Sequence, residues 1–143
     1  MKRLSIIFIL LISLLMGVAS CGGDEEPIGS WERMKWTNVN NLMNIQGVYY
    51  LPVEGGSYTF LCRNYSHPWI NSVTVNGITL VPDIIENRIE FNGEWFTAKF
   101  EDNKLIITAD ALPQSVSSRS FTILVTAGDI GDSFEFAQQQ NIY

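Results

Sequence analysis

The sequence predicts an all-β fold, an antiparallel β-sandwich of about eight short strands. From residue 33 onward, β-branched and aromatic residues alternate with polar ones, and Gly, Asn, Asp and Pro recur at short intervals. Asn-Gly pairs at 76–77 and 92–93 are typical of tight hairpin turns, because both residues tolerate a positive φ. No run of twelve residues in this part keeps a helical period. Short strands joined by hairpins pack as two antiparallel sheets.

Turn residues divide the first half of the domain into four strands. Pro52 ends one of them, because proline has no N–H to donate to a neighbouring strand. Gly55 and Gly56 supply the next turn, and the first Asn-Gly pair closes the half. The expected strands cover residues 34–37, 47–51, 57–63 and 69–75.

The second half continues the same pattern. The second Asn-Gly pair separates two strand-like runs, and Asp102 and Asn103 turn the chain into a third. Residues 128–132 are rich in Gly and Asp and are expected to form the last hairpin turn. The expected strands cover residues 88–91, 95–100, 104–108, 121–126 and 134–138.

The alternation also predicts which side chains form the core. In an antiparallel sandwich each strand buries one face, and burying one large apolar side chain contributes about 1.5–3 kcal/mol. The core candidates are Phe60, Ile70, Val73, Phe100, Leu105, Ile107, Phe121, Ile123, Val125, Phe134 and Phe136. Such a set is large enough for a stable core without a disulfide or a metal ion.

The first 20 residues have the layout of a secretory signal peptide. Lys2 and Arg3 precede an apolar run at 4–18, and small residues follow it. The apolar run has 15 residues, whereas a membrane-spanning helix needs about 20. Processing is therefore favoured over a transmembrane helix.

Val18-Ala19-Ser20-Cys21 resembles the lipobox of bacterial lipoproteins. The resemblance implies that Cys21 is lipidated and becomes the first residue of a membrane-anchored chain. Residues 21–32 then form a flexible acidic tether, and the acidic run at 24–26 resembles the export signal of surface lipoproteins in Bacteroidetes-type bacteria. The expected location is the outer membrane, on the cell surface or the periplasmic face.

The charge excludes one class of partner. Lys2 and Arg3 are two of the 9 basic residues and no acidic residue lies in 1–20, so residues 21–143 carry 7 basic and 15 acidic side chains, a net charge of −8. Nucleic-acid binding requires clustered Lys and Arg, so no nucleic-acid partner is expected.

Residues for catalysis or metal binding are scarce. His67 is the single histidine, and no Gly-x-Ser-x-Gly motif exposes a serine nucleophile. With Cys21 lipidated, Cys62 remains alone and is expected to be a small core residue, so neither a disulfide nor a zinc site is predicted. The acids at 129–132 suit a hairpin turn better than a calcium loop. No enzyme activity, metal or cofactor is expected.

Five strand signatures resemble those of a BACON domain, an immunoglobulin-like module common in secreted proteins of Bacteroidetes. The matching segments are 53–60 with Asn64 and Trp69, 95–97, 105–109, Arg119 with 121–125, and 134–136 with Gln138, Gln139 and Gln140. The resemblance covers about 48–141 and implies that residues 33–143 form one immunoglobulin-like sandwich. Residues 71–93 are longer than the family pattern.

Aromatic side chains near loops are the candidate binding residues. Tyr65, Trp69 and Trp95 could stack on a sugar ring, with Asn64 and His67 orienting its hydroxyls. The alternative places both tryptophans in the core. Three functions stay open: a surface lipoprotein that binds a glycan or a protein, a spacer or accessory subunit of a cell-envelope assembly, and a hydrolase with paired carboxylates in a cleft.

Overall fold

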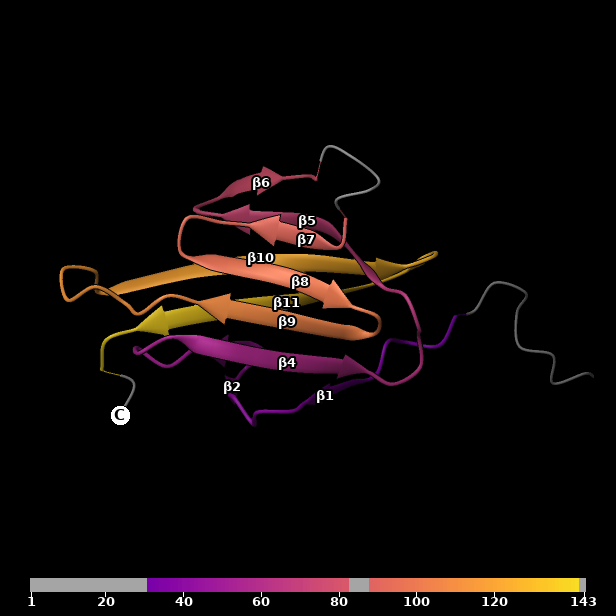
Figure 1. Cartoon of the computed structure of the whole chain (residues 1–143), viewed down its shortest axis with the longest axis horizontal. Helices are drawn as coiled ribbons and strands as arrows, with labels where there is room; N and C mark the ends of the chain where they lie inside the picture. The colour runs from indigo at the N-terminus through magenta and orange to yellow at the C-terminus, as the bar shows by residue number, and fades with distance from the viewer. Residues whose placement is uncertain (1–30, 83–87, 142–143) are drawn as a thin grey trace, which may run out of the picture. The chain divides into compact units, whose positions relative to one another are not determined.

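The computed structural model describes residues 31–82 and 88–141, all within the compact unit 31–143. These residues form eleven strands and no helix, arranged in two sheets that pack face to face, as in immunoglobulin-like sandwiches (Figure 1). In chain order the strands are β1 (Trp36–Asn38), β2 (Met43–Ile45), β3 (Val48–Tyr50), β4 (Gly56–Cys62), β5 (Trp69–Val75), β6 (Ile78–Leu80), β7 (Glu90–Asn92), β8 (Phe96–Glu101), β9 (Lys104–Ala109), β10 (Ser118–Ala127) and β11 (Ile130–Gln139). The predicted all-β sandwich is confirmed.

The two sheets differ in size and in the direction of one pair. The five-stranded sheet has the order β1-β4-β9-β8-β7, and the six-stranded sheet has the order β2-β3-β11-β10-β5-β6. Strands β3 and β11 pair in parallel, with Val48 opposite Glu135. The prediction of a wholly antiparallel sandwich is therefore wrong at this pair. A hairpin forces antiparallel pairing, but the long chain between β3 and β11 permits either direction.

The number of strands is larger than predicted. Strand β2 was not predicted, and β6 was indicated only by the Asn-Gly turn before it. Both have three residues, and alternation cannot be recognised over so short a run. Strands β10 and β11 are longer than predicted and begin at Ser118 and Ile130. The predicted turn at 128–132 consequently shortens to two residues, and Gly128 supplies the positive φ of 64°.

The two Asn-Gly pairs behave differently. Asn76 and Gly77 have φ values of 52° and 76° and join β5 to β6 in the predicted two-residue turn. Asn92 is instead the last residue of β7 and pairs with Thr97, and three residues, 93–95, connect the two strands. The predicted hairpin is present, but the predicted two-residue turn at Asn92-Gly93 is wrong. Gly93 is required there because a Cβ atom would lie 2.8 Å from the Phe96 ring.

All eleven predicted core residues are buried between the sheets, and so is Cys62. The structure adds core residues from loops, from strand ends and, with Ala98, from within β8, namely Met34, Leu42, Leu51, Phe96, Ala98 and Ala109. Aromatic rings dominate the packing: Phe96 and Phe121 come from opposite sheets and stack with centroids 3.6 Å apart. Trp36, at the edge strand β1, packs edge-to-face on Phe134 at 4.9 Å.

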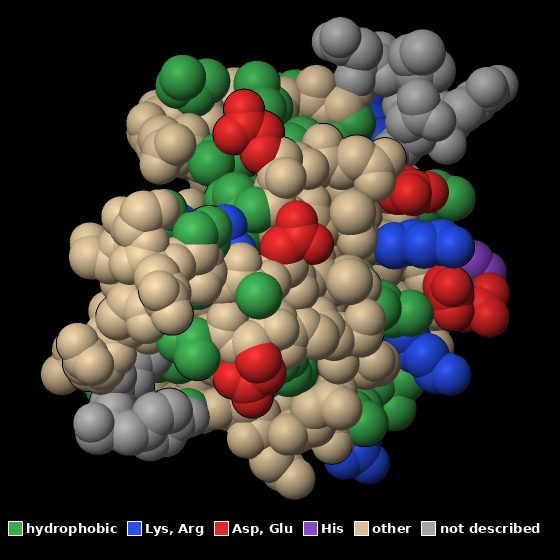
Figure 2. Space-filling model, turned by 60° about the vertical axis from the view of Figure 1, so that its left-hand side comes forward, with side chains coloured by type: hydrophobic (Ala, Val, Ile, Leu, Met, Phe, Trp, Pro, Cys, Tyr) green, Lys and Arg blue, Asp and Glu red, His purple; other side chains and the backbone are tan. Residues whose placement is uncertain are grey.

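Charged side chains lie on the outer surface. On the face in Figure 2, acidic side chains are dispersed, and basic ones gather along one margin. Among the described residues, the two salt bridges join Lys35 to Glu32 and Lys99 to Glu101. Both pairs are exposed, and such pairs contribute little to stability.

Candidate functional site

A cleft of about 540 Å³ opens where β5 begins and β8 ends. It is lined by His67, Pro68, Trp69, Arg88, Ile89, Phe100 and Asp102. Three separate segments supply these residues: the approach to β5, the approach to β7, and the end of β8 with its turn. The cleft is thus built by tertiary contacts and not by one motif.

Backbone hydrogen bonds hold the approach to β7 between the two sheets. The Ile70 N–H donates to the Arg88 carbonyl at 2.6 Å, and the Phe100 N–H donates to the Ile89 carbonyl at 2.7 Å. One bond reaches the six-stranded sheet and the other reaches the five-stranded sheet. Arg88 and Ile89 therefore form one wall of the cleft at the junction of the sheets.

Trp69 is the largest side chain of the cleft and is half-buried. It lies opposite Thr126 in the β5–β10 ladder, and its neighbour Ile70 points into the core. Alternation along the strand therefore directs the indole away from the core. The sequence left open whether Trp69 is exposed or part of the core. The structure places it between these alternatives, half-buried and lining the cleft.

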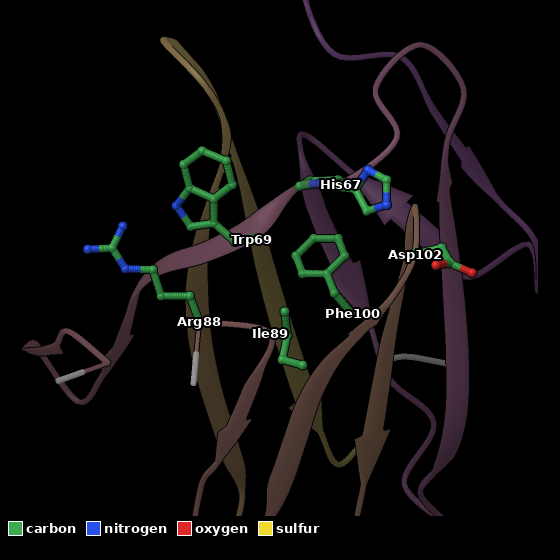
Figure 3. A pocket seen from close by; sticks show the side chains of 7 residues that line it. His67, Trp69, Arg88, Ile89, Phe100 and Asp102 are labelled. Atoms are coloured by element: carbon green, nitrogen blue, oxygen red, sulfur yellow. The ribbon is translucent and has the colours of Figure 1, made fainter. Parts of the chain in front are cut away.

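The cleft has an apolar middle and polar ends. In Figure 3, Trp69, Ile89 and Phe100 occupy the middle, Arg88 lies at one end, and His67 with Asp102 lies at the other. Apolar surfaces with a few polar groups at the margin are the usual composition of small-molecule sites. A flat ligand could stack in the middle and present hydroxyl or anionic groups to the ends.

The cleft shows no arrangement for nucleophilic catalysis. The His67 ring Nδ1 lies 3.0 Å from the hydroxyl oxygen of its neighbour Ser66, and both side chains are exposed. Catalytic dyads join a nucleophile and a base that a third group orients. The Ser66–His67 contact joins neighbours in the chain and does not have the geometry of such a dyad.

Asn64 and Tyr65 lie outside the lining of the cleft, although the sequence grouped them with Trp69. The Asn64 side chain accepts a hydrogen bond from the Lys35 N–H at 2.9 Å and donates one to the Arg33 carbonyl at 2.8 Å. The Tyr65 hydroxyl donates to the Glu32 carbonyl. Both side chains are thus used to hold residues 32–35 against the domain.

Trp95 lies in a second hollow, a groove of about 620 Å³ between the β5–β6 and β7–β8 hairpins. The Arg119 guanidinium covers its ring at 4.1 Å from the centroid, and Phe96 and Phe121 contact it edge-on. Trp69 and Trp95 therefore do not form one aromatic strip. Like Trp69, Trp95 is half-buried.

A buried polar network beside Trp95 escaped the sequence analysis. Gln138 is fully buried; its amide donates to the Pro52 and Asp110 carbonyls at 2.7 and 3.0 Å and accepts from Arg119 Nε at 2.8 Å. Burial lowers the pKa of the Arg119 guanidinium, and the Asp110 carboxylate opposes this effect. The alternation of β11, with Gln138 in phase with Phe134 and Phe136, is the signal that could have located it.

Neither a metal centre nor a membrane-spanning helix is found in residues 31–82 and 88–141. No three His, Cys, Asp or Glu side chains of this part cluster as metal ligands would. No helix of this part is long and apolar enough to cross a bilayer. Cys21, the predicted lipidation site, lies outside the described residues.

Comparison with known proteins identifies a relative among solved structures. A protein from Bacteroides thetaiotaomicron, determined by NMR, is 35% identical, covers 82% of this chain and 96% of its own, and superposes with a TM-score of 0.68. The M1 domain of titin is 12% identical over 75% of this chain and 93% of its own, with a TM-score of 0.45. An endo-fucoidan hydrolase of glycoside hydrolase family 107 is 14% identical over 73% of this chain and 14% of its own, with a TM-score of 0.41. No protein-family model and no curated protein matches this chain.

Proposed function

This chain belongs to the same family as the Bacteroides thetaiotaomicron protein, and from that premise we propose that it is a non-catalytic binding lipoprotein of the outer membrane. The module would be BACON-like and anchored through lipidated Cys21, on the cell surface or the periplasmic face. Its ligand would be a glycan held in the cleft that contains Trp69. The lipobox-like segment at 18–21 supports the anchor.

The composition of the cleft carries the glycan proposal. A half-buried indole beside apolar Ile89 and Phe100 offers a flat surface for the apolar face of a sugar ring. His67 and Asp102 at one end can exchange hydrogen bonds with hydroxyl groups, and Arg88 at the other end can bind a carboxylate or sulfate substituent. Stacking plus a few polar contacts is sufficient for weak, selective binding.

A glycan array with the chain from residue 22 onward tests this function. We expect binding that Trp69→Ala reduces at least tenfold, because one or two aromatic residues usually dominate such a site. Trp31→Ala is the matched control, since Trp31 is 59% exposed and does not line the cleft. Retention of no glycan by the folded chain, or equal losses in both variants, would contradict the proposal.

The alternative, a spacer or accessory subunit of a cell-envelope assembly, is favoured by a different observation. Edge strand β6 exposes Ile78 and Leu80, and Val81 follows it on the surface. Apolar edge strands invite pairing with another chain, and monomeric proteins usually protect them. A protein partner at this edge would leave the Trp69 cleft unused.

A further inference from the structure

The six-stranded sheet extends one strand beyond its partner sheet. Strand β7 ends the five-stranded sheet and lies over β5, so no strand of that sheet covers β6 (Figure 1). Ile78 and Leu80 pair with Val75 and Val73, and Val73 is fully buried on the inner face. Ile78 and Leu80 therefore point to the core side of the sandwich, yet they are 65% and 46% exposed.

This uncovered inner face forms one side of the groove that contains Trp95. The groove is lined on that side by Val75, Ile78 and Leu80 and on the other by Phe91, Trp95 and Phe96. Figure 2, which turns this end of the molecule forward, shows hydrophobic side chains gathered around a recess with acidic side chains near it. Core-side apolar groups without a covering strand lose the contacts that an interior position normally provides.

The free edge of β7 offers backbone groups beside the same groove. The Phe100 N–H donates to the Ile89 carbonyl and the Gly93 N–H donates to the Phe96 carbonyl, so odd-numbered residues bond to β8. Glu90 and Asn92 therefore direct their N–H and C=O groups away from β8. Neither residue has a backbone partner on that side among the described residues.

We propose that the groove binds an extended segment of a partner protein, which adds as a sixth strand to β7. Such a strand would satisfy Glu90 and Asn92 and would lay its inner side chains on Ile78 and Leu80. Addition to the free edge of β6 is less favourable, because it would lengthen the overhang and expose more inner-face apolar surface. Strand addition is a common mode of peptide recognition.

The charges of the groove indicate the chemistry of the segment. Glu94 lines the groove and Glu90 lies on β7. Neither has an ion-pair partner in residues 31–82 and 88–141, since Lys99 opposite Glu90 bonds to Glu101. The Arg119 guanidinium is engaged by Trp95, Gln138 and two backbone carbonyls. A strand with alternating apolar and basic residues is therefore complementary, whereas a second copy of this acidic chain is less so.

The test measures binding of the synthetic peptide Lys-Val-Lys-Val-Lys-Val-Lys to the chain from residue 22 onward. We expect saturable shifts of the Glu90 and Asn92 amide resonances, and at least tenfold weaker binding by the matching Glu-Val peptide. Two further peptides carry N-methyl groups on the lysines or on the valines. Only one edge of an added strand bonds to β7, so one of these peptides should bind and the other should not.

Variants of the protein complete the test. Leu80→Lys should weaken binding at least tenfold, whereas Ile45→Lys, at a 45% exposed position on edge strand β2, should not change it. Trp69→Ala should also leave peptide binding intact, so failure of the glycan proposal is distinguishable from failure of this one. Absence of binding, equal binding of both N-methylated peptides, or a dimer by sedimentation velocity that Leu80→Lys abolishes would overturn the proposal, the last by identifying a second copy as the occupant.

Discussion

At the scale of single residues, the buried Gln138 side chain shows how a polar group is accommodated in the core. Gln138 is the buried polar side chain among the described residues, and it uses both amide donors and its carbonyl on Pro52, Asp110 and Arg119. Its three bonds join the start of one turn, the end of β9 and strand β10. A satisfied buried amide is tolerated and makes the packing specific, whereas an unsatisfied one costs about 1–3 kcal/mol.

Gly55 and Gly77 provide a matched pair for separating backbone strain from steric exclusion. Their φ values are 77° and 76°, but a Cβ on Gly55 would lie 2.4 Å from the Ala109 carbonyl oxygen, and a Cβ on Gly77 would meet nothing within 4 Å. We expect Gly77→Ala to lower the free energy of unfolding by about 1–2 kcal/mol, the cost of a left-handed backbone. Gly55→Ala should cost at least about 3 kcal/mol, because backbone atoms must also move. Urea denaturation measures both, and equal losses would show that the close approach to β9 is absent.

At the scale of elements, the segment before β1 is held by side chains that the sequence had suggested as ligand contacts. Asn64 bonds to Lys35 and Arg33, and Tyr65 bonds to Glu32. The hydrogen bond from Lys35, with a further one from Asn64, lowers the pKa of the Glu32 carboxyl. Because a lowered carboxyl pKa stabilises the folded state only while the group is charged, this contribution is present at neutral pH and is lost as the pH falls through the lowered pKa.

Asn64→Ala should release the leading segment without unfolding the domain. The Lys35 amide donates to Asn64, so its hydrogen exchange should accelerate at least tenfold, while core amides in β10 keep their protection. Asn44→Ala is the control: it removes a comparable side-chain bond to the Gly47 amide in the β2–β3 turn. If the Lys35 amide keeps its protection in Asn64→Ala, or loses it in Asn44→Ala as well, Asn64 does not hold the segment before β1.

At the scale of the whole molecule, the two hollows lie at different junctions of the same two sheets. The cleft at the start of β5 contains Trp69, and the groove between β6 and β7 contains Trp95. A glycan in the first and a peptide strand in the second would use different chemistry, stacking in one and backbone pairing in the other. One module could therefore attach to a partner and present a binding cleft independently.

The anchor is also a property of the whole chain. Cys21→Ala should release the protein from the membrane fraction or leave its signal peptide uncleaved, because Cys21 alone has a lipobox-like context. Cys62→Ala is the matched control, since Cys62 is fully buried in the core and should not affect partitioning. Fractionation followed by immunoblotting measures both. A cleaved Cys21→Ala protein that remains in the membrane fraction like the wild type would disprove lipid anchoring.

Patterns local in the chain could be predicted from sequence. Alternation located all eleven core candidates, because the period of a strand fixes which residues share a face. The Asn76-Gly77 turn was predicted correctly because Asn and Gly both tolerate the positive φ that a type I′ hairpin turn requires. The small number of His and Cys residues and the lack of clustered basic residues are also read directly from the sequence. They argue against a zinc site and a nucleic-acid partner.

What depended on contacts between distant segments was decided by the tertiary structure alone. The parallel β3–β11 pair, the cleft built by Trp69 and Arg88, and the overhang of β6 all depend on which strands become neighbours. Tyr65 and Trp69 are close in sequence, yet Tyr65 bonds to the segment before β1 and Trp69 lines the cleft. Strand periodicity determines only the face on which a side chain lies; the pairing of sheets determines what that face meets.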